Sequence, residues 1–185
     1  MNALDQPLAV RALRLVGESL AGSGVRAPIR LVVAGGAAGL LAKLLAPSRT
    51  TADCDVIWVE DLSWASVAEA AAKVAVRLGL SSTWLNRECS HYAWCLPLDW
   101  RVRCKPVGTF GPLNVLRLSR IDLVATKVIG APVRPQDLED LRVIRPTSTE
   151  LEFIDSHLDR LESEHLDGRS FDAERAIVQA LRGVP

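Results

Sequence analysis

The sequence predicts an α/β (α+β) protein, with a mixed sheet flanked by helices and a helical C-terminal segment. Three observations favour this fold class. Two apolar, β-branched runs in the first half are separated by a glycine turn and a helix-like stretch, residues 99–118 contain runs with strand-like alternation, and the chain after Ser119 has helical periodicity. With 185 residues, of which 49% are hydrophobic, the chain is long enough to bury a core without disulfides.

The first half of the chain predicts helices alternating with strands. Apolar residues at helical spacing and short β-branched runs define these elements, and proline or glycine lies near several of their ends. In order, the expected elements are a helix from about Pro7 to Leu20, a strand at 30–34, a helix from the turn at 35–36 to about Ala46, a strand at 55–59 and a helix at 63–78.

The second half predicts a hairpin followed by helices. Residues 99–104 and 113–118 alternate with period two, so each should form a strand with one buried face, and 108–112 should form the turn between them. Thr147 and Glu150 form a capping box that opens a helix, and a last helix is expected at about 170–181. We expect residues 1–145 to form the main domain and residues 146–185 to form helices packed on it.

Charge and cysteine usage exclude several classes of protein. The 22 Lys and Arg residues balance the 22 Asp and Glu residues, so the chain lacks the basic excess of proteins that bind nucleic acid or anionic membranes through charge alone. The longest uncharged stretch in the apolar first half, 31–42, is too short to span a membrane. The start of the chain does not resemble a signal peptide, and the four cysteines lack a CxxC or disulfide framework. A cytoplasmic protein without a membrane partner is therefore expected.

Two short motifs lie close together and suggest a common site. Asp53 and Asp55, two residues apart on a strand, should present their carboxylates on one face, about 7 Å apart along the chain. Such a pair favours a hard cation such as Mg²⁺. The turn at Gly35 and Gly36, where a helix begins, offers backbone N–H groups to a phosphate. The alternative is that Asp53 is simply a polar residue before a strand and that the glycines form an ordinary tight turn.

These motifs resemble those of a known family. The stretch VVAGGAAGLLAKLLAPSRTTADCDVIW resembles the opening of nucleotidyltransferase-like proteins of the DNA polymerase beta superfamily, in which a Gly-Gly or Gly-Ser turn precedes an Asp-x-Asp strand. The segment RIDLVATKVIGAPVRPQDLEDL, 120–141, is similar to the second signature of the AbiEii-type branch, which includes toxins of type IV toxin–antitoxin systems. Residues 84–86 and 145–150 look closest to an uncharacterised bacterial group within that branch.

The resemblance implies a role for each matching residue. Asp53 and Asp55 become catalytic carboxylates that bind Mg²⁺ or Mn²⁺, and Gly35 and Gly36 become the turn that approaches the nucleotide phosphates. In the second signature, the catalytic residues are Lys127, which contacts phosphate, and Asp137 with Asp140. Arg134 lies in the same segment, and it either binds the nucleotide by clamping phosphate or pairs with Asp137.

Some features of the sequence depart from the family pattern. Gln136 stands where a basic residue is usual, and Gly36 replaces the serine of the Gly-Ser form. No acid lies at the centre of a later predicted strand, and Asp99, at a strand start, is the best candidate for the third carboxylate that would activate an attacking hydroxyl. Asp137 also has a simpler interpretation, because an acid in the first turn of a helix is favoured by the helix dipole. Lys127, in an apolar segment, has the alternative of a snorkelling side chain.

The function implied is Mg²⁺-dependent transfer of a nucleoside monophosphate from a nucleoside triphosphate to an acceptor hydroxyl on RNA or protein. The toxin resemblance implies an RNA acceptor, contacted by Arg101, Arg103 and Lys105, and a cognate antitoxin partner; the alternative for these basic residues is a solvated strand face. The first alternative function is a catalytically degenerate nucleotidyltransferase fold that serves as a binding module. A Rossmann-type dinucleotide fold is a second alternative, because 34–39 differs by one substitution from GxGxxG. The spacing of Cys89, His91 and the later cysteines matches no common zinc site, and the aromatic residues at 84–100 favour packing over base stacking.

Overall fold

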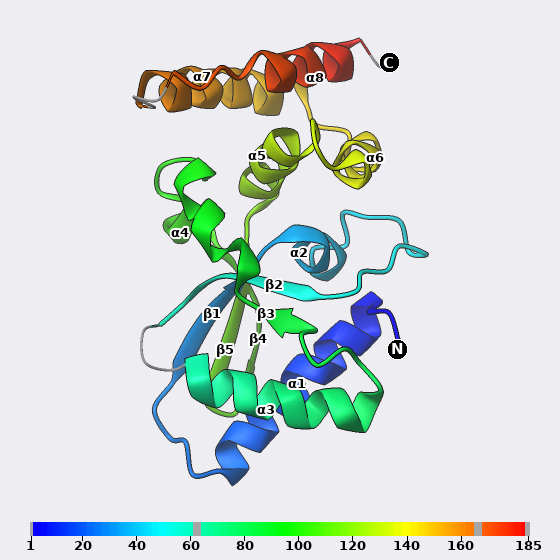
Figure 1. Cartoon of the computed structure of the whole chain (residues 1–185), viewed down its shortest axis with the longest axis vertical. Helices are drawn as coiled ribbons and strands as arrows, with labels where there is room; N and C mark the ends of the chain where they lie inside the picture. Colours follow the sequence, from blue (N-terminus) through cyan, green and yellow to red (C-terminus); the bar gives the residue numbers. More distant parts are fainter. Residues whose placement is uncertain (1, 61–63, 165–167, 184–185) are drawn as a thin grey trace. The chain divides into compact units, whose positions relative to one another are not determined.

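The structure, a computed structural model, describes residues 2–60, 64–164 and 168–183. The chain forms two compact units, each described by itself below (Figure 1). The sheet unit comprises residues 1–94 and 99–119, and the helical unit comprises residues 95–98 and 120–185. The mixed α/β class predicted from the sequence is confirmed, as is the helical character of the C-terminal part.

A five-stranded mixed sheet forms the centre of the sheet unit, in the order β3-β2-β1-β5-β4. β1 pairs antiparallel with β2 and parallel with β5, β2 pairs parallel with β3, and β4 and β5 form an antiparallel hairpin. The strands are β1 (Ile29–Val33), β2 (Cys54–Val59), β3 (Leu85–Asn86), β4 (Lys105–Phe110) and β5 (Leu113–Arg117).

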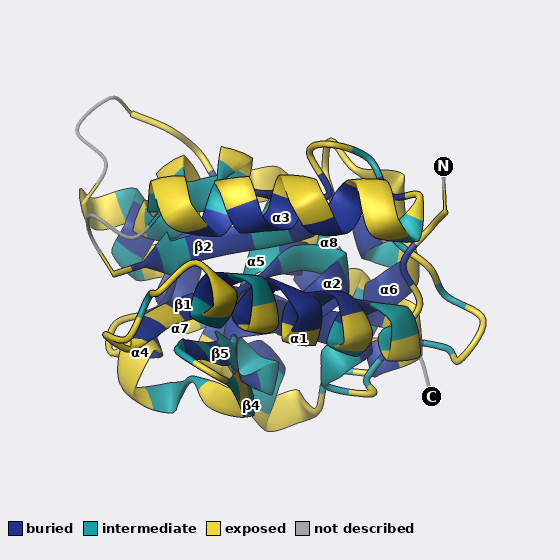
Figure 2. Ribbon diagram, turned by 90° about the horizontal axis from the view of Figure 1, so that it is seen from below, coloured by how far each residue is buried: buried dark blue, intermediate teal, exposed yellow. Residues whose placement is uncertain are grey.

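Two long helices of the sheet unit lie side by side, with buried stripes on their inner sides and exposed residues outside (Figure 2). They are α1 (Gln6–Gly22), whose first turn is capped by the Asp5 carboxylate, and α3 (Trp64–Leu78). The shorter helices are α2 (Gly35–Leu41), the 3-10 helix η1 (Glu88–Cys95) and α4 (Trp100–Arg103).

Close packing in the sheet unit depends on one small residue and one large one. A Cβ at Gly17 would lie 2.0 Å from the Phe110 carbonyl oxygen, so only glycine lets α1 approach the backbone of β4 this closely. Trp84 is fully buried, and its indole N–H donates a 3.0 Å hydrogen bond to the Ala71 carbonyl. This satisfied, buried indole bears out the packing interpretation for Trp84.

Three predicted elements of the sheet unit are wrong in their bounds or type. The turn expected at 108–112 is confined to 111–112, because 108–110 belong to β4 and pair with β5. The helix after the glycine turn ends at Leu41, not near Ala46, because Lys43 has a positive φ of 56° and the chain folds back. Residues 99–104 are not a strand: α4 occupies 100–103, and β4 begins at Lys105. The alternation there was misleading, since Val102 is 85% exposed and has no buried face to pair with. Pro106 is accommodated because β4 is an edge strand.

The described residues of the helical unit form the helices α5 (Arg120–Gly130), α6 (Pro135–Ile144), α7 (Ser148–Glu164) and α8 (Asp172–Arg182). The predicted capping box at the start of α7 is confirmed. The Thr147 N–H donates to a Glu150 carboxylate oxygen at 2.8 Å, and the Glu150 N–H donates to the Thr147 hydroxyl at 3.2 Å. The predicted end of this helix at Asp167 lies outside the described residues. Within the described ranges no helix combines the length and apolar character needed to cross a membrane.

A short segment of the helical unit, residues 95–98, is held by α7. His157 Nε2 lies 2.9 Å from the Cys95 carbonyl oxygen, to which it donates, and Arg160 donates to the Leu96 carbonyl at 3.3 Å. Arg160 also donates to His157 Nδ1 at 3.2 Å, so a neutral imidazole satisfies both contacts. Burial, together with the charge of Arg160, lowers the pKa of His157, although the hydrogen bond to Cys95 and nearby acids act in the opposite direction.

Candidate functional site

The predicted site residues fall into two groups, one in each unit. Gly35, Gly36, Asp53 and Asp55 lie together in the sheet unit, which we call the glycine–aspartate cluster. The second group, from the second signature, lies in the helical unit and consists of Lys127, Arg134, Asp137 and Asp140. Each group is described from its own contacts.

Asp53 directly precedes β2 and Asp55 lies on it, and their spacing of two residues predicts a common face. Asp53, Asp55 and Trp58 are half-buried, whereas the residues between them are buried. Strict alternation would move Trp58 to the opposite face from Asp55, but the pairing of β1 with β2 shifts register across Val56 and Ile57. Such a bulge lets two consecutive side chains point into the core and restores the alternation beyond them. The bulge therefore brings Trp58 back to the carboxylate face.

The glycine turn is packed against Asp55. The Ala34 N–H donates to the Asp55 carbonyl at 2.9 Å, which joins the end of β1 to β2. Gly35 has a positive φ of 60°, and a Cβ there would lie 2.7 Å from Asp55 Oδ2. Any larger residue would be strained and would also displace the carboxylate. Glycine is therefore required at this position both by backbone conformation and by the close approach of Asp55.

The loop before β2 completes the glycine–aspartate cluster. Thr51 is fixed by two backbone hydrogen bonds to Leu4, and its hydroxyl donates to Asp53 Oδ1 at 3.3 Å. A Cβ at Gly36 would lie 3.2 Å from this hydroxyl and 3.7 Å from a terminal nitrogen of Arg49. Arg49 also donates to the Thr50 carbonyl. Sequence reasoning missed Arg49 and Thr51, because neither belongs to a recognisable motif and only the fold of the loop brings them to the glycines.

The buried thiol between the two carboxylates is not a reactive group. Cys54 is fully buried, and burial, followed by the negative charges of Asp55 and Asp53, raises its pKa far above the usual range of a thiol. It therefore remains protonated at physiological pH and is neither a nucleophile nor a ready metal ligand.

The two carboxylates of the glycine–aspartate cluster are of the type that holds magnesium in proteins. Mg²⁺ is commonly held by one or two carboxylates together with substrate phosphates and water. Asp53 and Asp55 supply two half-buried carboxylates beside a turn that has no side chains to obstruct a phosphate. In the parts of the chain that the structure describes, no group of three His, Cys, Asp or Glu side chains is placed to hold a metal.

The third carboxylate predicted at Asp99 is not on a strand. Asp99 is exposed, has a positive φ of 58° and directly precedes α4. The strand next to Asp55 instead offers Asn86, whose backbone is paired with that of Asp55 and whose side-chain oxygen accepts from the Glu88 N–H at 2.8 Å. An amide is a much weaker base than a carboxylate, so the position beside Asp55 carries no general base.

The second group forms a buried ion cluster between α5 and α6, which we call the lysine cluster. The Lys127 ammonium donates to Asp137 Oδ1 at 2.9 Å and to Asp140 Oδ2 at 2.6 Å. Its side chain is only 3% exposed, and those of Asp137 and Asp140 are 12% and 4% exposed. The i,i+3 spacing of the two acids places both on one face of α6, toward α5. The sequence thus grouped these residues correctly.

Arg134 extends the lysine cluster to the surface. Its Nε lies 2.8 Å from Asp137 Oδ2, which is the ion pair expected as the alternative to a phosphate clamp, and its side chain is 62% exposed. Gly130 makes room for this contact, since a Cβ there would lie 2.4 Å from both Asp137 Oδ2 and an Arg134 nitrogen. The charges of Lys127 and Arg134 balance those of Asp137 and Asp140. Because Lys127 on α5 is paired with both acids of α6, it links the two helices. Its ammonium would have to leave these carboxylates before it could contact a phosphate.

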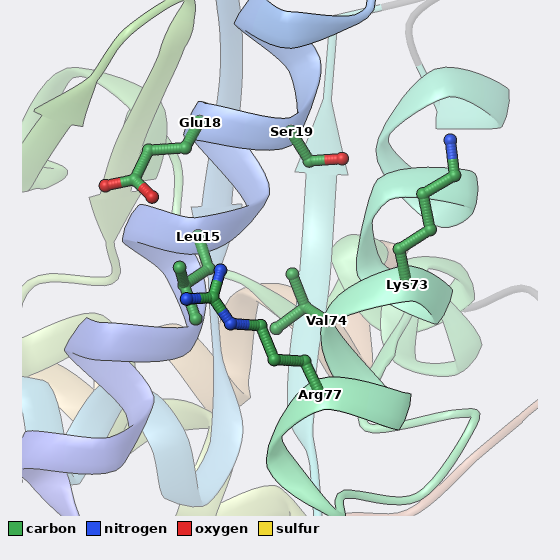
Figure 3. A pocket seen from close by; sticks show the side chains of 6 residues that line it. All are labelled: Leu15, Glu18, Ser19, Lys73, Val74 and Arg77. Atoms are coloured by element: carbon green, nitrogen blue, oxygen red, sulfur yellow. The ribbon is translucent and has the colours of Figure 1, made fainter.

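A groove of about 300 Å³ lies between α1 and α3 of the sheet unit (Figure 3). Arg77 reaches across toward Leu15, whereas the Lys73 ammonium points away and pairs with Glu69 at 2.8 Å. None of the predicted site residues lines this groove, and its charged side chains do not converge. The lining residues are Leu15, Glu18, Ser19, Lys73, Val74 and Arg77.

The topology rejects one alternative for the glycine turn. A Rossmann unit requires parallel strands joined by a right-handed helical crossover. Here β1 and β2, on either side of α2, are antiparallel neighbours. The near match of residues 34–39 to GxGxxG therefore does not mark a dinucleotide fold. No protein-family model, curated protein sequence or solved structure matches the chain.

Proposed function

We propose that the protein is a Mg²⁺- or Mn²⁺-dependent nucleotidyltransferase, which moves a nucleoside monophosphate from a nucleoside triphosphate to an acceptor hydroxyl. The observation that carries this proposal is the close packing of the turn at Gly35 against the Asp55 carboxylate, with the half-buried Asp53 two residues earlier. Paired carboxylates beside a glycine turn suit a metal-bound polyphosphate.

Each residue of the glycine–aspartate cluster has a distinct task in this proposal. Asp53 and Asp55 hold the divalent cation, which stabilises the charge that develops on the transferred and leaving phosphates. Gly35 and Gly36 let the phosphates approach the backbone. The Thr51 hydroxyl orients Asp53 through their 3.3 Å contact, so that the carboxylate is positioned before the substrate binds.

Arg49 is the cation that best complements the polyphosphate within the sheet unit. A terminal nitrogen of its guanidinium lies 3.7 Å from the position of a Cβ at Gly36, beside the turn that admits phosphate. Arginine binds phosphate through paired N–H donors and keeps its charge at all physiological pH values. In this proposal, we therefore assign to Arg49 the phosphate contact that the family resemblance gave to Lys127. The phosphate clamp was also one of the two expectations for Arg134.

The test is calorimetric binding of each of the four nucleoside triphosphates, with and without Mg²⁺. The wild-type protein is expected to bind at least one of them only with the metal, and Asp53→Asn/Asp55→Asn should abolish that binding. Glu18→Gln, which removes a negative charge from an exposed position on α1, is the matched control. Metal-independent binding, or equal binding by the double variant, would overturn the proposal.

A second candidate function is a catalytically degenerate nucleotidyltransferase fold that binds a ligand or partner without turnover. It is favoured by the amide of Asn86 beside Asp55, where a third carboxylate would serve catalysis, and by the pairing of Lys127 with two acids. Metal-dependent nucleotide binding without release of pyrophosphate in the presence of RNA or protein acceptors would select this candidate.

The acceptor and the cellular role extend the first proposal. The resemblance to type IV toxins favours an RNA acceptor and a cognate antitoxin protein in the cytoplasm. Induced expression should then arrest growth, and Asp55→Asn should relieve the arrest at equal protein level. Labelling of cellular RNA by a radioactive nucleoside triphosphate, compared between the same two proteins, would identify the acceptor class, whereas labelling of protein alone would exclude RNA.

A further inference from the structure

Arg101 is an exposed cation held against aromatic rings. Its guanidinium carbon lies 5.7 Å from the ring centroid of Trp58 and 5.1 Å from that of Trp100. Both distances are within the range of cation–π attraction. Trp100 is buried, with 8% exposure, and so anchors α4, whereas Trp58 is half-buried on β2. Among the described residues, no salt bridge involves Arg101, although the exposed Asp99 is only two residues away.

This arrangement leaves the hydrogen-bonding capacity of Arg101 available. Contacts with aromatic rings use the face of a guanidinium, and its five N–H donors lie in the plane. A side chain already restrained by two rings also loses less conformational entropy when it binds a ligand. The preferred partner of such a fork is a planar or tetrahedral oxyanion, above all a phosphate.

The position of Trp58 relates Arg101 to the glycine–aspartate cluster. The register shift in β2 returns Trp58 to the same face as Asp55, three residues earlier. At a rise of roughly 3.3 Å per residue, the two positions are about 10 Å apart along the strand. Trp58, which the guanidinium contacts, therefore lies on the carboxylate face of β2 but farther along the strand, where Arg101 would meet a part of the substrate remote from the reacting phosphate.

Resting on the proposed function, we propose that Arg101 binds a backbone phosphate of an acceptor RNA strand, with Trp58 and Trp100 as positioning residues. Two observations favour the acceptor over the triphosphate. The first is the separation from Asp55. The second is the continuation of positive charge from Arg101 through Arg103 to the exposed Lys105 at the start of β4, since a polynucleotide meets several cations in succession.

The experiment measures fluorescence anisotropy of a labelled ten-nucleotide single-stranded RNA of mixed sequence, without triphosphate or Mg²⁺, at several salt concentrations. Arg101→Gln should weaken binding roughly 5- to 50-fold and should reduce the slope of log affinity against log salt by about 0.7, the value for one phosphate contact on a single strand. Arg101→Lys should keep the slope but bind more weakly than wild type, because lysine lacks the planar fork. Trp58→Leu should also weaken binding without changing the slope, since it leaves the charge in place.

The matched control is Arg11→Gln, which removes an exposed arginine of α1 that contacts no aromatic ring among the described residues, and it should bind RNA as the wild type does. Equal affinities for Arg101→Gln and Arg11→Gln would overturn the proposal, as would a wild-type protein that does not bind the RNA. An effect of Arg101→Gln on triphosphate binding alone would overturn the assignment to the acceptor. The double variant Asp53→Asn/Asp55→Asn should retain RNA binding. RNA binding is therefore tested independently of whether the proposed metal and triphosphate binding fails.

Discussion

Replacement of Lys127 by methionine tests whether the lysine cluster stabilises the helical unit. The substitution keeps the aliphatic volume but leaves Asp137 and Asp140 facing each other without the ammonium that lies 2.9 and 2.6 Å from their oxygens. Removal of one partner from a buried ion pair costs about 3–5 kcal/mol, because the remaining charge is left buried and uncompensated. In a protein of this size that loss corresponds to a decrease in Tm of about 6–20 °C.

The assay is urea denaturation followed by circular dichroism, with wild type, Lys127→Met and Lys127→Met/Asp140→Asn compared at pH 7. The double variant retains one cation and one anion, Arg134 and Asp137, which lie 2.8 Å apart. It should therefore recover about half of the lost free energy of unfolding. A loss below about 1 kcal/mol in Lys127→Met, or no recovery in the double variant, would refute the reasoning.

The same double variant separates structure from chemistry. If Lys127 only joins α5 to α6, the refolded double variant should bind triphosphate and Mg²⁺ as tightly as wild type. Loss of that binding in a protein with restored stability would show that Lys127 contacts the nucleotide, as the family resemblance implies, and that it exchanges its carboxylates for phosphate when substrate arrives.

Three further predictions concern the glycines and the pH dependence of stability. Gly35→Ala should lose metal-dependent triphosphate binding by at least 10-fold and destabilise the fold by about 1–2 kcal/mol, because a Cβ there would lie 2.7 Å from Asp55 Oδ2 at a φ of 60°. Gly17→Ala should reduce the free energy of unfolding by about 1–3 kcal/mol in a urea titration, even though alanine favours helix, since its Cβ would lie 2.0 Å from a backbone oxygen. Burial lowers the pKa of His157, so the unfolded chain binds more protons than the folded protein below about pH 6.5. The free energy of unfolding should therefore fall as the pH decreases from that value toward the folded pKa. In His157→Gln, the free energy of unfolding should depend less on pH in this range.

Each of these expectations has a contrary outcome. Gly35→Ala that binds triphosphate normally would show that the turn does not need to approach the ligand. Gly17→Ala as stable as wild type would mean that α1 can move away from β4 at little cost. A stability curve with the same slope between pH 6.5 and 5 in wild type and His157→Gln would show that His157 does not dominate the titration there.

The elements that the sequence predicted correctly are those encoded by local interactions. The capping box at Thr147 involves groups three residues apart, and both of its hydrogen bonds form. Likewise, β1 and β2 are mostly apolar, β-branched runs, each with one charged residue near its start, and the helices after Ser119 follow one apolar stripe each. Such signals are complete within a few residues, so they survive without knowledge of the fold.

The elements that the sequence predicted incorrectly have local patterns that conflict with tertiary contacts. Residues 99–104 alternate like a strand, yet Trp100 finds a buried position as part of a short helix, and Val102 is left exposed. The helix expected to continue to Ala46 stops early because Leu45 folds back onto Gly39, where a Cβ would lie only 2.7 Å from a Leu45 methyl carbon. In both places long-range packing outweighs intrinsic propensity.

The sequence by itself predicted the α/β class, the two-residue spacing of Asp53 and Asp55 and the position of Asp137 and Asp140 on one face of a helix, since these depend on periodicity within single elements. Only the tertiary structure decided what these groups contact. It brought Asp55 to Gly35, and it placed Arg101 over the ring of Trp58, which a register shift returns to the carboxylate face. These contacts join residues from 20 to 43 positions apart in the sequence. Such contacts arise from the packing of separate elements, and no periodicity within one element encodes them.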